Sequence, residues 1–131
     1  MLSRSGLPLA KPVQRRRISS IYYCITVVDS RGRLADRSAL YVMQWSAAQP
    51  IDFAVGSETV IITGKKSSVW RITKQGHLRL PPNIRYALGI SASDRLVVAA
   101  DKHAGKLVVG TTGWLDRALG FRTNEREAGD R

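Results

Sequence analysis

The chain has very little of the chemistry that cross-links a small protein or lets it bind metal. Its 131 residues include one cysteine, Cys24, and two histidines, His77 and His103, which lie far from it in sequence. A single thiol cannot form a disulfide framework, and this spacing gives no cluster of metal ligands. We therefore expect no disulfide, no metal and no cofactor, and a reducing compartment, the cytoplasm.

Long apolar runs and catalytic patterns are also missing. No run approaches the ~20 apolar residues of a membrane span, so we expect no membrane association. The stretch "IYYCITVV" ends at Asp29 without a small-residue cleavage site, which disfavours a secretory signal, while the acid-free, Arg- and Ser-containing start leaves a transit peptide as an alternative. Without a Ser/His/Asp spacing or a histidine near Cys24, we expect no enzyme.

Acidic residues are scarce relative to basic ones. The chain has 21 Lys and Arg against 10 Asp and Glu, a formal net charge of +11. The excess is concentrated in residues 1–20, which contain no acid, and in residues 70–114. Such a charge favours a polyanionic partner, and nucleic acid is the first candidate.

What the chain does contain is one order of elements that occurs twice. The first copy has a β-branched strand at 22–28, a turn at 29–32, a helix at 36–45 with Asp36 as N-cap, and strands at 51–55 and 59–63. After the spacer "GKKSS" the second copy has strands at 70–74 and 77–80, a helix from Pro81 or Pro82 to Leu88, and strands at 95–100 and 106–110. Residue identity between the copies is low, so the duplication rests on the order of elements.

The second copy contains a strand that turns directly into a very short helix. Leu78 and Leu80 share one face of the strand, as a half-buried strand requires. Proline suits the first helical position, and Gly89 can adopt the left-handed C-terminal cap. The pattern predicts one or two helical turns fixed at both ends, with Arg85 projecting beside the polar face of the strand.

The segments "ITKQGHLRLP", "NIRYALGI", "SDRLVV" and "GKLVV" follow one another between residues 70 and 110. In this combination the second copy resembles the AbrB/MazE/SpoVT family of small bacterial DNA-binding domains, and residues 26–64 are a weaker match. The resemblance implies a mostly β fold, a swapped-hairpin barrel built from two tandem β-α-β-β half-units with short helices. We expect a basic flexible arm at 1–20, a degenerate AbrB-like half-unit at 21–64, a linker at 65–69, an AbrB-like half-unit at 70–112 and a C-terminal helix and tail at 113–131.

The resemblance also implies duplex DNA binding, as a bacterial transcriptional regulator associated with the nucleoid. The family's Gly-Arg turn stands here as Gly32 and Arg33, and as Gly76 and His77. The helix-initiating proline is Pro81, with Arg37 as its counterpart, and the helix arginine is Arg85, with Tyr41 as its counterpart. The implied DNA-binding residues are Arg31, Arg33, Lys74, His77, Arg79 and Arg85.

Several alternatives remain open at this point. The two copies pair within one chain as a pseudo-dimer, or like copies pair between chains in a homodimer. The basic run Arg15, Arg16 and Arg17 contacts the phosphate backbone or is a solvated tail. RNA is an alternative to DNA, because charge does not distinguish them. The alternative function is an antitoxin or protein-interaction module whose C-terminal tail, residues 115–131, binds a toxin.

Overall fold

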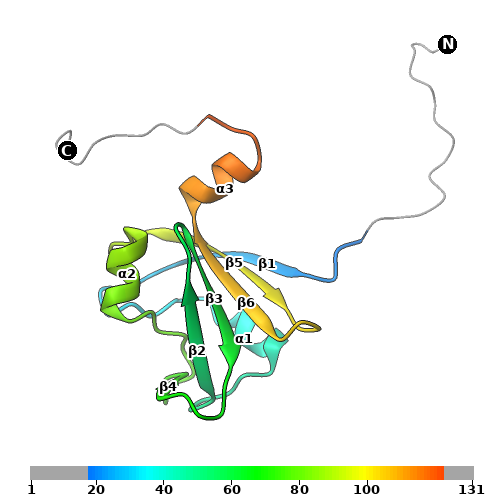
Figure 1. The fold of residues 1–131 in the computed structure, drawn as a ribbon, viewed down its shortest axis with the longest axis vertical. Helices are drawn as coiled ribbons and strands as arrows, with labels where there is room; N and C mark the ends of the chain where they lie inside the picture. The colour runs from blue at the N-terminus through cyan, green and yellow to red at the C-terminus, as the bar shows by residue number, and fades with distance from the viewer. Residues whose placement is uncertain (1–17, 123–131) are drawn as a thin grey trace, which may run out of the picture.

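Strands from both halves of the chain share one sheet (Figure 1). The computed structural model describes residues 18–122, and within them six antiparallel strands form the sheet, with three short helices around it. The strands are β1 (Tyr22–Val27), β2 (Pro50–Val55), β3 (Thr59–Gly64), β4 (Trp70–Arg71), β5 (Arg95–Asp101) and β6 (Lys106–Thr111), and the helices are α1 (Ser38–Met43), α2 (Pro82–Leu88) and α3 (Thr112–Ala118). The expected mostly β fold is confirmed.

The strand order β1-β5-β6-β3-β2-β4 shows how the halves combine. The first strand of each half lies at an edge of the sheet, against the hairpin of the other half, because β1 pairs with β5 and β4 pairs with β2. The two hairpins meet through β3 and β6. Exchanging the halves reproduces the same order read backwards. A pseudo-twofold axis therefore passes between β3 and β6 within a single chain.

The turns after β1 and β4 repeat the same backbone geometry. The Gly32 N–H donates to the Asp29 carbonyl over 3.0 Å, and the Gly76 N–H donates to the Thr73 carbonyl over 2.9 Å. Both glycines have a left-handed backbone, with φ of 86° and 85°. Two segments of different sequence thus adopt one turn conformation that glycine makes possible.

A second pair of equivalent bonds crosses between the halves. The Ala48 N–H donates to the Ile72 carbonyl over 3.0 Å, and the Ser93 N–H donates to the Val28 carbonyl over 2.7 Å. Ala48 and Ser93 both have positive φ, of 67° and 75°. The loop that precedes each hairpin therefore holds the first strand of the other half in the same manner.

The core lies on one face of the sheet, where α1 and α2 cover it. Alternation along the strands buries one set of side chains, comprising Val60, Ile62, Leu96, Val98, Leu107 and Val109. The helices add Leu40, Met43, Ile84 and Leu88. Full burial of each of these side chains contributes about 1.5–3 kcal/mol. Helix α3 lies on the opposite face, where the Trp114 ring packs against Gly110.

In the second copy the helix was predicted correctly, whereas the two strands before it were not. Helix α2 was predicted correctly: it begins at Pro82, and Gly89 ends it with φ of 69°. The strand expected at 77–80 was wrong. In the part of the chain that the structure describes, its pairing is limited to one bridge between Arg79 and Arg33, although Leu78 and Leu80 are buried as the alternation indicated. The strand expected at 70–74 is reduced to Trp70–Arg71, since β2 pairs with only these two residues.

In the first copy the helix is shorter than the predicted range 36–45. It spans Ser38–Met43, and Gln44 ends it in the left-handed conformation. The N-cap is Arg37 rather than Asp36, and no side chain caps it. The Asp36 carboxylate still accepts the Ser38 N–H over 2.7 Å. None of the helices in residues 18–122 has the length and apolar character needed to cross a bilayer.

Candidate nucleic-acid interface

The two glycine turns, one from each half, lie against each other. The Leu34 N–H donates to the Leu78 carbonyl over 2.9 Å, and the Leu80 N–H donates to the Gly32 carbonyl over 2.8 Å. Arg33 and Arg79 are bridge partners between these bonds. The turns are therefore joined through their backbones, and basic residues that are distant in sequence become neighbours.

Close packing explains why Gly32 is a glycine. A Cβ at this position would lie 2.4 Å from the Leu80 carbonyl oxygen and 2.7 Å from Nε of Arg85. At Gly76 the nearest atom is Nη1 of Arg37, at an ordinary 3.5 Å. The two turns share a conformation, but only the first is tightly enclosed by the other half.

Arginine side chains fix this contact by donating to backbone carbonyls across the two halves. Nε of Arg79 donates to the Arg31 carbonyl over 2.7 Å. Arg85 donates from Nη1 to the Ser30 carbonyl of the first half over 3.3 Å, while its Nε donates to the Leu80 carbonyl of its own half over 2.9 Å. A guanidinium has five N–H donors, so each of these side chains keeps further donors for a ligand.

Arg37 makes a third contact across the halves that the sequence did not indicate. Its Nη1 donates to the Gln75 carbonyl over 2.9 Å, which joins the start of α1 to the second glycine turn. In the family resemblance Arg37 stands only as the counterpart of the helix-initiating Pro81. Because its partner is a backbone carbonyl 38 residues away, no local pattern could have shown this role.

Asp29 organises the first turn and pairs with Arg33. Its Oδ1 accepts the N–H groups of Arg31 and Arg33, each over 2.9 Å, and its Oδ2 accepts from Nε of Arg33 over 2.7 Å. The Arg33 backbone N–H is the main cause that lowers the pKa of Asp29 to about 2, and the Arg33 side chain and Arg31 N–H lower it further. The carboxylate offsets part of the charge of Arg33 and holds its guanidinium in place.

In the second turn Thr73 takes the place of Asp29, and His77 takes the place of Arg33. Oγ1 of Thr73 accepts the His77 N–H over 2.9 Å, which is the same turn-closing bond with a neutral acceptor. Nδ1 of His77 lies 3.2 Å from the Leu34 carbonyl. With the proton on Nδ1 donated to that carbonyl, Nε2 is left as a hydrogen-bond acceptor.

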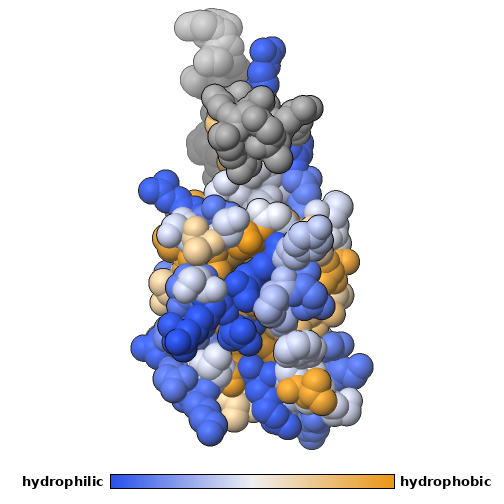
Figure 2. All heavy atoms as spheres, turned by 90° about the vertical axis from the view of Figure 1, so that its left-hand side faces the viewer, coloured by the Kyte–Doolittle hydropathy of each residue, from blue (hydrophilic) through white to orange (hydrophobic). Residues whose placement is uncertain are grey.

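Arg31 and Lys74 are the least constrained of the basic residues. Both are exposed, and within residues 18–122 neither side chain has a hydrogen-bond or salt-bridge partner. Across segments 29–37 and 73–85 there are six Lys and Arg and two Asp. Figure 2, seen from the side where α2 lies in Figure 1, shows hydrophilic side chains gathered across this face. The joined turns therefore carry a net positive charge.

The structure brings most of the expected site together. Arg31, Arg33, Arg79 and Arg85 are linked by the bonds described above, His77 lies against the first turn, and Lys74 precedes Gln75, whose carbonyl Arg37 contacts. The basic run Arg15, Arg16 and Arg17 lies outside the described residues, as do residues 123–131 of the tail. Asp29 was missed, although an Asp four residues before an Arg across a glycine turn is a local signal for such a turn.

Comparison of the chain with family models, curated proteins and solved structures found no match. What this face can bind therefore follows from its own residues. Its components are two joined turns, guanidinium groups fixed on backbone carbonyls, and two unconstrained cationic side chains. Such a surface offers hydrogen-bond donors and positive charge to an extended anion.

Proposed function

We propose that the chain binds duplex DNA through one composite face, formed by the glycine turns of both halves, and acts as a bacterial transcriptional regulator. The observation that carries the proposal is the direct contact of the two turns, with Arg79 and Arg85 of the second half donating to the Arg31 and Ser30 carbonyls of the first. Neither half alone would present this set of donors. The compartment proposed with this function is the cytoplasm, with the protein at the nucleoid.

The side chains suit two kinds of contact with DNA. Arg31 and Lys74 are exposed and unconstrained, so we assign them to phosphates, where flexible cations bind without sequence preference. Arg33, Arg79 and Arg85 are held by their Nε groups, which leaves N–H donors in fixed directions. A preorientated guanidinium is the group that bonds O6 and N7 of guanine in the major groove.

We further propose that the fold is an intrachain swapped-hairpin barrel. Support comes from the sheet order, in which each half's first strand pairs with the hairpin of the other half. The two halves present different residues at equivalent places, such as Arg33 against His77. A DNA site read by this face is therefore expected to lack the twofold symmetry of a palindrome, because the protein's own symmetry is only approximate.

Binding and its salt dependence test the proposal. Fluorescence anisotropy with mixed-sequence duplex DNA would be measured over a salt series for the wild type, Arg31→Ala and Lys74→Ala. Each variant is expected to reduce the slope of log K against log salt by about one unit if the residue contacts one phosphate. Within residues 18–122 neither side chain has a hydrogen-bond or salt-bridge partner, so neither change should unfold the protein.

Lys102→Ala is the matched control, since Lys102 is an exposed lysine in the turn between β5 and β6. Its removal lowers the net charge equally and should leave the slope unchanged. Equal effects of all three substitutions would show that only total charge matters, and would contradict a localised face. Structured RNA that competes better than duplex DNA would redirect the proposal to RNA.

A further inference from the structure

Strand β1 has an open edge on the side away from β5. Among the described residues, 18–122, pairing on this side is confined to its C-terminal end: the Ala35 N–H donates to the Val27 carbonyl over 3.0 Å, and Val28 bridges Leu34. In an antiparallel strand each residue points its N–H and its C=O to the same side, and this side alternates from one residue to the next. Tyr23 and Ile25 therefore point these groups away from β5, as Val27 does. Among residues 18–122, no backbone hydrogen bond to Tyr23 or Ile25 is made on this edge.

The side chains of β1 do nothing to prevent pairing with another strand. The sequence "YYCITV" contains no charge, proline or glycine, which are the features that normally protect an exposed edge. Tyr23, Ile25 and Val27 share one face, with 62%, 55% and 43% of their surfaces exposed. The strand thus combines free backbone groups with an uncovered apolar surface.

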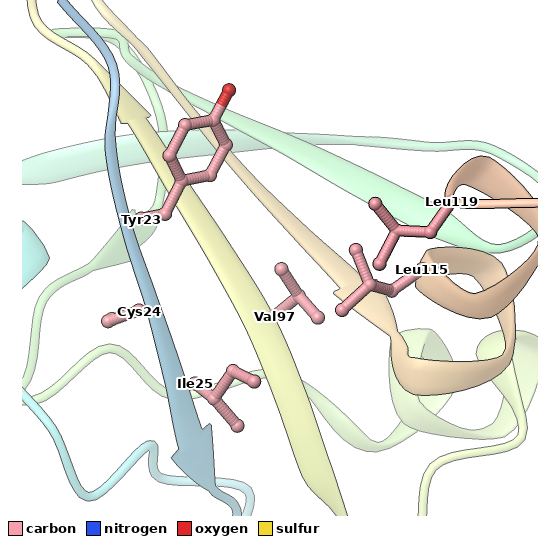
Figure 3. A pocket seen from close by; sticks show the side chains of 6 residues that line it. All are labelled: Tyr23, Cys24, Ile25, Val97, Leu115 and Leu119. Atoms are coloured by element: carbon pink, nitrogen blue, oxygen red, sulfur yellow. The ribbon is translucent and has the colours of Figure 1, made fainter. Parts of the chain in front are cut away.

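This surface continues into a groove beside α3. Tyr23, Ile25 and Val97 line one wall and Leu115 and Leu119 the other, around a volume of about 520 Å³. Figure 3 shows the side chains of Tyr23, Ile25 and Val97 on the side of the sheet that faces α3, while Cys24 points the other way. In a chain of net charge +11, the side chains lining this groove are all uncharged.

The size of the surface matches what one half of a dimer needs. The exposed parts of Tyr23, Ile25, Val27 and Leu119 amount to roughly 450 Å² per chain, given the surface of large apolar side chains. Antiparallel pairing of two copies would bring together about 900 Å² of apolar surface, just under the ~1,000 Å² that a specific interface should exceed, and the paired backbone and rim add to it. A patch of this size is comparable to the largest apolar patch of a typical monomer, and such patches are often functional.

We propose that this surface binds a second copy of the chain, through antiparallel pairing of β1 with β1 of the partner. With the twofold axis beside Cys24, Tyr23 of each copy lies opposite Ile25 of the other, and the free backbone groups of both residues are satisfied. Twofold pairing of an uncharged strand is self-complementary and brings no like charges together. The two sheets become continuous, and the two α3 grooves lie on the same face of the joined sheet.

The mass of the full-length chain in solution tests the pairing. Light scattering coupled to size exclusion is expected to give the mass of two chains, and Ile25→Lys to reduce it to one at the same concentration. Ile25 is more than half exposed, so lysine should be accommodated in the single chain. Val55→Lys, a change of an exposed strand residue on β2, is the matched control and should leave the dimer intact. Circular dichroism verifies that both variants fold.

Cys24, the only cysteine, reports the register. In the proposed register Cys24 lies opposite Cys24 of the other copy, and residues directly opposite in an antiparallel pair have Cβ atoms about 4.5–5.5 Å apart. A short bismaleimide should therefore cross-link two wild-type chains through these thiols, and should give no cross-linked dimer with Ile25→Lys. A single-chain mass at all concentrations would overturn the proposal, as would a dimer unaffected by Ile25→Lys or a dimer without the cross-link. A small protein that co-purifies in place of the second copy would assign the groove to a different partner. None of these outcomes depends on DNA binding.

Discussion

The two glycine turns offer a matched pair of substitutions, because they share a backbone conformation but differ in their surroundings. Gly32→Ala and Gly76→Ala both place a side chain at φ near 85°. For a non-glycine residue this left-handed conformation costs roughly 1–2 kcal/mol. That cost applies equally to both variants and is the whole expected effect at Gly76, where the nearest atom is 3.5 Å from the new Cβ.

At Gly32 the new methyl group has no space. Its Cβ would lie 2.4 Å from the Leu80 carbonyl oxygen, which is rigid backbone, and 2.7 Å from Nε of Arg85, so the two turns must separate. Separation threatens the Leu80 N–H bond to the Gly32 carbonyl and the Arg85 Nη1 bond to the Ser30 carbonyl. Each such bond contributes about 0.5–1.5 kcal/mol. Gly32→Ala should therefore destabilise the fold by about 3–4 kcal/mol, twice the loss at Gly76 or more.

Urea denaturation monitored by tryptophan fluorescence measures the difference directly, since the chain has three tryptophans. Thermal unfolding of the same variants is the second measurement: at about 3–5 °C of melting temperature per kcal/mol for a chain of this size, Gly76→Ala should lower Tm by roughly 5 °C and Gly32→Ala by 10 °C or more. Equal losses in the two variants would refute the reasoning. They would mean that Gly32 is not enclosed by the second half and that the joined turns do not exist as described.

Three further predictions concern the turn, the core and helix α3. The pKa of Asp29 is lowered to about 2, below the ~3.9 of an unfolded aspartate, so its contribution to stability is present above pH 4 and is lost as the pH falls toward 2; Asp29→Asn should flatten the fall of the urea midpoint across this window. Leu107→Ala removes a fully buried side chain and should cost about 2–5 kcal/mol in urea unfolding, whereas Lys106→Ala next to it is exposed and should be neutral within about 0.5 kcal/mol. Thr111 Oγ1 accepts the Trp114 N–H over 3.2 Å at the start of α3. Thr111→Ala removes this cap and should raise the rate of amide hydrogen exchange in α3, whereas Thr111→Ser keeps the hydroxyl and should exchange at a rate near that of the wild type.

The features that the sequence predicted well are those determined by neighbouring residues. Helix α2 is specified by a proline at its start, the apolar pair Ile84 and Leu88, and a glycine at its end, and all of these act within one or two turns of helix. The hairpin strands likewise follow from alternation and β-branched residues. The expected strand at 77–80 shows the limit of such reasoning: alternation correctly indicated which leucines are buried, but a strand also requires a partner of sufficient length.

The candidate site could be predicted only in part, because its geometry depends on contacts between the halves. That Arg31, Arg33, Arg79 and Arg85 share a region was expected from the family resemblance. The partners of Arg79 and Arg85 across the halves are the Arg31 carbonyl, 48 residues away, and the Ser30 carbonyl, 55 residues away, and no sequence pattern encodes such pairs. For the same reason the sequence could not indicate that β1 lies at an edge of the sheet, because "YYCITV" has the composition of a buried strand.

The two proposals together constrain how a dimer would engage DNA. The first glycine turn follows the C-terminal end of β1, and antiparallel pairing of two β1 strands directs these ends away from each other. The DNA-binding faces of the two chains would therefore lie at opposite ends of the joined sheet. Such a dimer would bind one duplex per chain and could bridge two duplex segments. Ile25→Lys should then abolish bridging, measured as co-capture of two differently labelled duplexes, while the affinity of each chain for a single duplex stays unchanged. A parallel loss of affinity would mean that β1 pairing and DNA binding use the same surface, which the positions of Ile25 and the glycine turns contradict.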